Sequence, residues 1–159
     1  FPVCRGRDLA LSSDGRRILV PEALQSADGL GIYDAESGEA IRGEPANNAA
    51  TTAPIPFSIA AHPKRDIAYV ACFGTNVVEF HNSNTGDYLN GTQAASSFPV
   101  NSGARAMLVD PDDETLYISS FDENAVIALD ALTGTGKRGD RASSTIPTSA
   151  GPRGLAIAV

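Results

Sequence analysis

The segment IYDAESG at residues 32–38 returns as FHNSNTG at residues 80–86 and as ALDALTG at residues 128–134. Each copy contains an Asp or Asn, three further residues and a Gly, and both positions recur at one constant interval, as Gly38, Gly86 and Gly134 illustrate. A further Asp or Asn stands ten residues before each of these glycines, at Asp28, Asn76 and Asn124. Because three independent positions keep one spacing, the chain contains an internal repeat of about 48 residues, and such a period indicates a repeat architecture.

Each repeat reads as four short strands joined by polar turns. The first two strands of each unit lie in RDLALSSDGRRILV (7–20), FSIAAHPKRDIAYV (57–70) and RAMLVDPDDETLYI (105–118). The third strands are GLGIY, NVVEF and AVIAL, and weaker fourth strands follow in EAIRG, DYLNG and GKRGD. Short apolar, β-branched runs separated by turn residues every 8–12 positions predict an all-β protein. Four antiparallel strands in a repeat of this length are typical of a β-propeller blade.

Three longer segments resemble the YVTN-type β-propeller repeat. They are PFSIAAHPKRDIAYVACFGTNVVEFHNSNTG, GARAMLVDPDDETLYISSFDENAVIALDALTG and GPRGLAIAV. The resemblance covers nearly all of the chain, and the first repeat departs from it most, with LVPEALQSADG in place of the family's Tyr-Val-x-Asn turn. It implies the propeller fold, whereas the family's functions range from surface proteins to lactonases and quinoprotein dehydrogenase subunits.

The repeat divides the chain into three predicted blades and one additional strand. We place blade one at about 6–44, blade two at about 56–92, blade three at about 104–140, and the first strand of a fourth blade at 153–159. Propellers close with about four to eight blades, so these predicted blades form an incomplete ring. We therefore expect the chain to be part of a longer polypeptide or to pair with further copies. A seven-blade ring of this period would need roughly 340 residues.

Composition excludes several classes of function. The 159 residues are 42% hydrophobic and 19% charged, with a formal net charge of −7. A nucleic-acid partner would require a basic face, so we expect none. We also expect no membrane span, because no run approaches the ~20 apolar residues that a span needs. Any signal peptide would lie outside this chain.

The two cysteines, Cys4 and Cys72, fit no metal or haem-attachment motif. The predicted topology puts them on one face of adjacent blades. They therefore allow one disulfide, which would imply an oxidising compartment.

Three arginines stand at the start of predicted innermost strands. They are Arg7, Arg105 and Arg153, and Phe57 occupies the equivalent position of blade two. Innermost strands of a propeller line its central channel, so these side chains would surround one mouth of the channel. Guanidinium groups placed there would bind a carboxylate or a phosphate. The alternative is that each Arg bonds backbone carbonyls or an acid of the neighbouring blade.

The remaining polar residues are explained by the repeat. The acidic turn 110–114 aligns with Ser12–Gly15 and with 62–66, and it lacks the spacing of a calcium loop, so we predict a solvated turn. His62 and His81 also occupy ordinary repeat positions. The recurring Asp and Asn residues are expected to cap turns by accepting nearby backbone N–H groups.

The sequence contains no convincing catalytic or cofactor motif. GTGKRG (134–139) matches a dinucleotide fingerprint only in its letters, and the chain lacks the Trp that quinoprotein repeats use. We therefore interpret the protein as a non-catalytic, extracytoplasmic binding or assembly module, periplasmic, at the cell surface or secreted, without cofactor or metal. Its partner would be another protein, further blades or further copies of the chain. The alternative is a fragment of an enzyme propeller, either a lactonase-like hydrolase or a quinoprotein-type dehydrogenase subunit.

Overall fold

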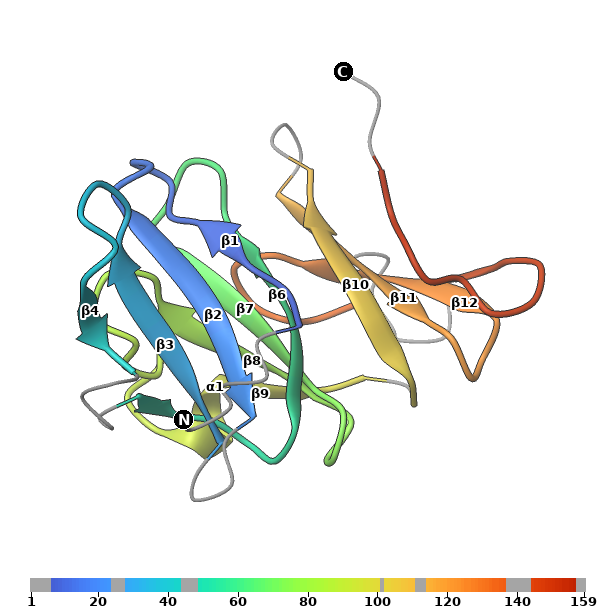
Figure 1. The fold of residues 1–159 in the computed structure, drawn as a ribbon. Helices are drawn as coiled ribbons and strands as arrows, with labels where there is room; N and C mark the ends of the chain where they lie inside the picture. The colour runs from blue at the N-terminus through green and yellow to red at the C-terminus, as the bar shows by residue number, and fades with distance from the viewer. Residues whose placement is uncertain are drawn as a thin grey trace.

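Three antiparallel sheets follow one another along the chain (Figure 1). The computed structural model describes residues 7–23, 28–43, 49–100, 102–110, 114–136 and 144–156. The first sheet is built from β1 (Ala10–Leu11), β2 (Arg17–Ala23), β3 (Asp28–Asp34), β4 (Ala40–Arg42) and β5 (Ala50–Thr51). The second contains β6 (Pro56–Ala61), β7 (Ile67–Cys72), β8 (Val77–Asn82) and β9 (Ser97–Pro99). The third contains β10 (Ala104–Val109), β11 (Thr115–Ser120), β12 (Ala125–Asp130) and β13 (Thr145–Pro147).

Each sheet has the strand order of its sequence, first to fourth, and β5 adds a third partner to β3, beside β2 and β4. The inner edge strand β6 contacts β1 and β2 of the first sheet and β10 of the third. Figure 1 shows the three sheets fanned out so that β1, β6 and β10 lie beside one another. The short helix α1 (Gln93–Ser96) precedes β9, and no helix in the described ranges is long and apolar enough to cross a membrane.

The repeat period is preserved in the pairing of the outer strand. Residue pairs Leu30–Ala50, Val78–Phe98 and Val126–Ile146 face each other in the three sheets, each one period after the last. This confirms the repeat at the level of hydrogen-bonded register. One-residue slips are costly because they would reverse which side chains face the core.

The predicted fourth strand is confirmed in the first sheet and wrong in the second. EAIRG supplies β4, whereas DYLNG contributes only the single bridge His81–Tyr88. In GKRGD, Gly136 forms a bridge with Leu129, and 137–140 lie outside the described residues, so this fourth strand stays a prediction. The outer strand of these two sheets is β9 or β13, and both lie beyond the predicted bounds of blades two and three. Each of these strands has three residues and pairs with one neighbouring strand. Three residues are too few to show an alternation of apolar and polar side chains.

The first strand of a fourth blade, predicted at 153–159, stays a prediction, because 157–159 lie outside the described residues; the described residues 151–156 form no strand. A β-strand is defined by hydrogen bonds to a neighbouring strand. No described residue pairs with 151–156.

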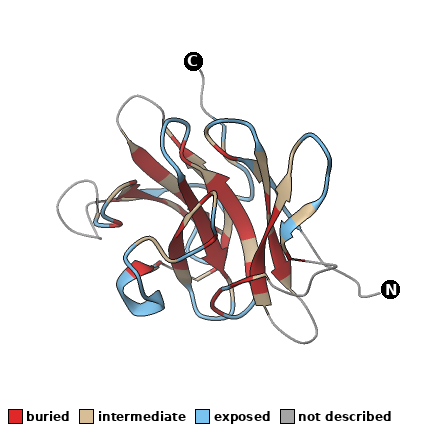
Figure 2. Cartoon of the chain, turned by 90° about the vertical axis from the view of Figure 1, so that its left-hand side faces the viewer, coloured by how far each residue is buried: buried red, intermediate tan, exposed pale blue. Residues whose placement is uncertain are grey.

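Two apolar cores lie between the sheets. The first joins Leu19 and Ile32 of the first sheet to Ile59 and Val70 of the second. The second sheet is therefore covered on both faces, and every residue of β7 is buried. Figure 2 shows the buried residues in red along the central strands of the molecule.

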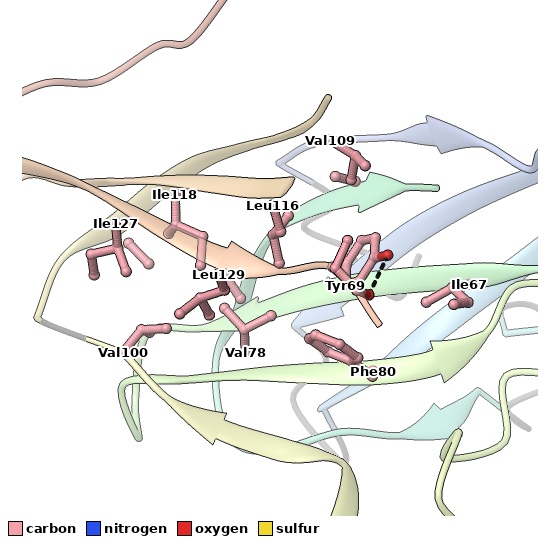
Figure 3. Packing of buried hydrophobic residues seen from close by; sticks show 14 residues of the cluster. Ile67, Tyr69, Val78, Phe80, Val100, Val109, Leu116, Ile118, Ile127 and Leu129 are labelled. Atoms are coloured by element: carbon pink, nitrogen blue, oxygen red, sulfur yellow. Dashed lines mark hydrogen bonds between the residues drawn. The ribbon is translucent and has the colours of Figure 1, made fainter. Parts of the chain in front are cut away.

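The core between the second and third sheets is built around two aromatic rings (Figure 3). Tyr69 meets Phe80 edge to face, with ring centroids 4.8 Å apart, and its hydroxyl donates to the Ala131 carbonyl at 2.8 Å. Leu116, Ile118 and Ile127 of the third sheet complete the cluster. Burial raises the pKa of the Tyr69 hydroxyl, so it remains a hydrogen-bond donor.

The turn after each third strand has the capping predicted from the sequence. Asp34 accepts from the amides of Glu36 and Ser37 at 3.1 and 2.9 Å, and Asn82 and Asp130 do the same two and three residues on. The amides of Ser37 and Glu36 hold the pKa of the Asp34 carboxyl below its usual value. The three glycines that close these turns all have positive φ.

The other Asp/Asn set has a longer reach than predicted. Asp28 accepts from the amide of Ile55, and Asn124 from that of Gly151, both at 2.8 Å and both 27 residues on. The Asp28 bond attaches the turn between β2 and β3 to the connection that leads into the second sheet, and the Asn124 bond attaches the equivalent turn of the third sheet to the segment after β13. Both are therefore long-range bonds rather than local caps.

We expect the Phe80→Ala substitution to lower the free energy of unfolding by about 3–5 kcal/mol, because it empties the centre of a packed aromatic cluster. Urea denaturation followed by circular dichroism measures the change. Ile41→Ala is the matched control, since Ile41 is 41% exposed on β4. A loss below about 1 kcal/mol for Phe80→Ala would contradict this packing.

Ile55 should be a site of backbone strain. It has a φ of +57°, while its equivalents Gly103 and Gly151 are glycines with φ of +79° and +61°. A β-branched residue is disfavoured there, and Ile55 is 47% exposed, so little packing compensates. We expect Ile55→Gly to stabilise the protein by about 1 kcal/mol in the same urea assay. Gly103→Ala, the reverse type of change, should destabilise it, and a stability loss for Ile55→Gly would refute the strain.

Candidate functional site

The four residues predicted at the start of the innermost strands lie in one cluster. Arg7 precedes β1, Phe57 and Arg105 lie in β6 and β10, and Arg153 lies in the segment after β13. Two further rings, Phe73 and Phe121, complete the group. We call these six residues the arginine–phenylalanine stack.

Cations and rings alternate along the stack. The Arg7 guanidinium carbon lies 5.0 Å from the centre of the Phe57 ring, and that of Arg105 lies 4.9 Å from it. Arg105 is also 5.1 Å from Phe73 and 5.5 Å from Phe121. Arg153 continues the series at 4.7 Å from Phe121. At these distances each cation is attracted to the electron-rich face of its ring.

The described partners of the three arginines differ from those that the alternative interpretation names. Neither a backbone carbonyl nor an acid of the described residues takes a hydrogen bond or ion pair from Arg7, Arg105 or Arg153; their partners are rings. A guanidinium that stacks on a ring uses its flat face and keeps its five N–H donors at the edge. Arg7 and Arg153 are exposed and Arg105 is half-buried, so these donor edges are available to a ligand.

Sequence reasoning missed Phe73 and Phe121, although a signal was present. They lie one repeat apart, each directly after a second strand, in CFGTN and SFDEN. Their amides donate to the carbonyls of Ile55 and Gly103 at 2.9 Å in both cases. These equivalent bonds place the two rings beside the innermost strands.

The acid next to Arg7 is already engaged. Asp8 Oδ2 accepts from the Ser58 hydroxyl at 2.7 Å and from the Ile59 amide at 3.1 Å, which ties the first sheet to β6. A hollow of about 430 Å³ opens beside it, lined by Arg7, Asp8, Leu9 and Val20. The stack therefore ends at an open space rather than in packed protein.

A second polar group, buried and missed by the sequence analysis, surrounds Glu79. Its Oε2 accepts from the Ala53 amide at 3.0 Å and lies 3.5 Å from His81 Nε2, and its Oε1 accepts from Gln93 at 2.8 Å and Ser97 at 3.2 Å. Burial opposes ionisation of Glu79, but the bonds from His81, Ala53 and Gln93 outweigh it and lower the pKa. The arrangement satisfies a buried carboxylate.

The first sheet also contains a buried carboxylate, but on its second strand, β2, whereas Glu79 lies on the third strand of the second sheet. Glu22 is fully buried and accepts from the Tyr33 hydroxyl, and the equivalent of Glu79 is Gly31. A Cβ at Gly31 would clash with the Glu22 carboxylate. Each of these two sheets thus contains a buried acid of this kind, on β2 in the first sheet and on β8 in the second.

His62 is buried at the contact between the second and third sheets. Its Nδ1 accepts from the Lys64 amide at 3.1 Å, and its Nε2 lies 3.9 Å from Glu114 Oε1. Glu114 is held by Arg65 at 2.7 Å. Burial lowers the pKa of His62, so it is neutral near pH 7. Pro111–Asp113 of the acidic turn lie outside the described residues, so its solvated state stays a prediction.

The proposed disulfide also stays a prediction, because Cys4 lies outside the described residues. Cys72 is a buried free thiol, 3.7 Å from Glu79 Oε2, and burial raises its pKa. Across the described part of the chain, no group of three or more His, Cys, Asp and Glu residues is placed to hold a metal ion.

Comparison with solved structures identifies the fold. Hydrazine synthase from Kuenenia stuttgartiensis superposes with a TM-score of 0.73 at 16% identity, over 93% of this chain and 37% of that chain. Hsv2 from Kluyveromyces lactis superposes with a TM-score of 0.57 at 8% identity, over 91% and 38%. The fold is a β-propeller. The three sheets are its blades, and they do not close a ring. At these identities the likeness shows the fold alone. No family model matches the chain, and neither does any curated protein.

We expect Glu79→Gln to lower the free energy of unfolding by about 2 kcal/mol at pH 7, because a charged acceptor of several hydrogen bonds is replaced by a neutral amide. The pKa of Glu79 is lowered below 4.5 by folding, so its contribution is complete above that pH and is lost as the pH falls. The two proteins should therefore converge in stability as the medium becomes acidic. Urea denaturation across pH 3–7 measures this.

Glu39→Gln is the matched control, because Glu39 is exposed in the turn before β4. A gap between wild type and Glu79→Gln that is constant with pH would contradict the ionised state of Glu79.

Proposed function

We propose that the chain is a non-catalytic YVTN-type propeller module that binds another blade surface and acts outside the cytoplasm within a longer chain or larger complex. The observation that supports the binding of another blade surface is the outer face of blade three. Leu116 and Ile118 point toward blade two, so the alternate residues of β11 point away from it. This outer face contains Leu108, Tyr117, Val126, Ala128 and Ile146.

The equivalent face of each earlier blade is covered. Leu19 of blade one packs on blade two, and Tyr69 of blade two packs on blade three, and both are fully buried. The strand pairing shows that Tyr117 occupies the position in blade three that Leu19 and Tyr69 occupy in blades one and two. It is half-buried, and Ile146 beside Val126 is 37% exposed. The partner best suited to this face is therefore another blade of the same repeat.

The chain spans 37% and 38% of the two propeller chains described above, and propellers close with about four to eight blades. In a longer polypeptide, further blades would cover the outer face. When the 159-residue chain is alone, a second copy of the chain is the available source of a blade that could cover this outer face. Apolar residues gathered on a partly exposed face favour such association.

We expect the purified chain to self-associate with rising concentration, as measured by size-exclusion chromatography with light scattering. Val126→Lys and the milder edge variant Ile146→Lys should reduce association, because each puts a charge into the contact. Ile41→Lys, on the exposed strand β4, is the control and should have no effect. A chain that stays monomeric at high concentration, or equal effects of all three variants, would contradict the docking role of this face.

We further expect no turnover of lactones and no dye-linked dehydrogenase activity from the purified chain. Spectrophotometric assays of both reactions provide the measurement. Metal-dependent turnover that co-purifies with the chain would favour an enzyme propeller.

A further inference from the structure

We propose that the arginine–phenylalanine stack is a binding site for an extended acidic peptide, whose carboxylates pair with the guanidinium edges of Arg7, Arg105 and Arg153. This site lies on the inner strands and is separate from the outer face of blade three. Its ligand chemistry goes beyond assembly of blades.

The first argument is the state of the donors. Three cations lie together in a chain whose net charge is −7, and the described residues supply none of them with a carboxylate. Asp8 is occupied by Ser58 and Ile59. Rings between the cations hold the guanidiniums in place without neutralising them. An anionic ligand is therefore the missing partner of the stack.

The second argument is the spacing of the cations. Arg7 and Arg105 lie 5.0 and 4.9 Å from the centre of the same Phe57 ring, so their guanidinium carbons are at most about 10 Å apart. Arg105 and Arg153 share Phe121 in the same way. In an extended peptide, residues i and i+2 are about 7 Å apart, and flexible acidic side chains can span the rest of the distance between two guanidinium groups.

The third argument is the chemistry between the charges. The guanidinium fork matches a planar carboxylate with two parallel hydrogen bonds. The exposed parts of Phe57, Phe73 and Phe121, all half-buried, offer apolar surface between the cations. A peptide chain places methylene groups between its carboxylates and can contact those rings. A phosphate polymer has no apolar part to place between the cations.

Isothermal titration calorimetry of the full chain with hexaglutamate tests the proposal. We expect hexaglutamate to bind at least tenfold more tightly than acetate, and the affinity to fall as salt is added, because exposed charges are screened. Arg105→Gln removes the central cation and should weaken binding about tenfold or more. Arg105→Lys keeps the charge but loses the planar fork, so it should weaken binding by a smaller factor.

The control is Arg16→Gln, which removes an exposed Arg from the first turn of blade one and should leave the affinity unchanged. Circular dichroism confirms that each variant is folded. Equal losses for Arg16→Gln and Arg105→Gln, or hexaglutamate binding no tighter than acetate, would overturn the site. Tripolyphosphate binding as tightly as hexaglutamate would overturn the peptide assignment. Because the Ile146→Lys variant keeps the stack, its hexaglutamate affinity separates failure of this site from failure of the assembly proposal.

Discussion

Each blade of this protein is a thin sheet with apolar residues on both faces, and such a sheet is stable only when something covers both. Blade two satisfies the condition within the chain, with Ile59 and Val70 facing one neighbour and Tyr69 and Phe80 facing the other. This need for mutual cover explains why the register repeats so strictly. If the strand pairing in a blade slipped by one residue, polar side chains would face a neighbouring blade whose surface is apolar.

The same constraint generates the arginine–phenylalanine stack. Stacking sheets face to face brings their inner edges together, so residues at one repeat position become neighbours although a full repeat separates them in sequence. Clustering of the arginines at this edge is offset by ring contacts, because Arg7 and Arg105 share the Phe57 ring and Arg105 and Arg153 share the Phe121 ring. The stack thus concentrates positive charge where blades meet, in a protein that is acidic as a whole.

Much of the fold could be predicted from the sequence, because the repeat carries it. The repeat period, the antiparallel order of strands and the capping by Asp34 all follow from pattern and turn chemistry. The outer strands β9 and β13 could not be predicted, since three residues with one hydrogen-bonded neighbour leave no periodic signal.

The candidate site was predicted in part. The four inner-edge residues follow from the repeat register, whereas the roles of Phe73 and Phe121 depend on how adjacent blades approach. Glu79 was missed because a single acid in a strand reads as solvent-facing. Its burial depends on partners from other segments, among them the Ala53 amide and Gln93.

Amide hydrogen exchange of the dilute chain, resolved by peptide, tests most directly the claim that a blade needs cover on both faces. The account predicts the slowest exchange in β7 and β8, which are covered on both sides, and faster exchange in β11 and β12, where the outer face is open. Protection of β11 and β12 should rise when the chain is concentrated enough to associate. Equal protection of blades two and three in the dilute monomer would contradict the account.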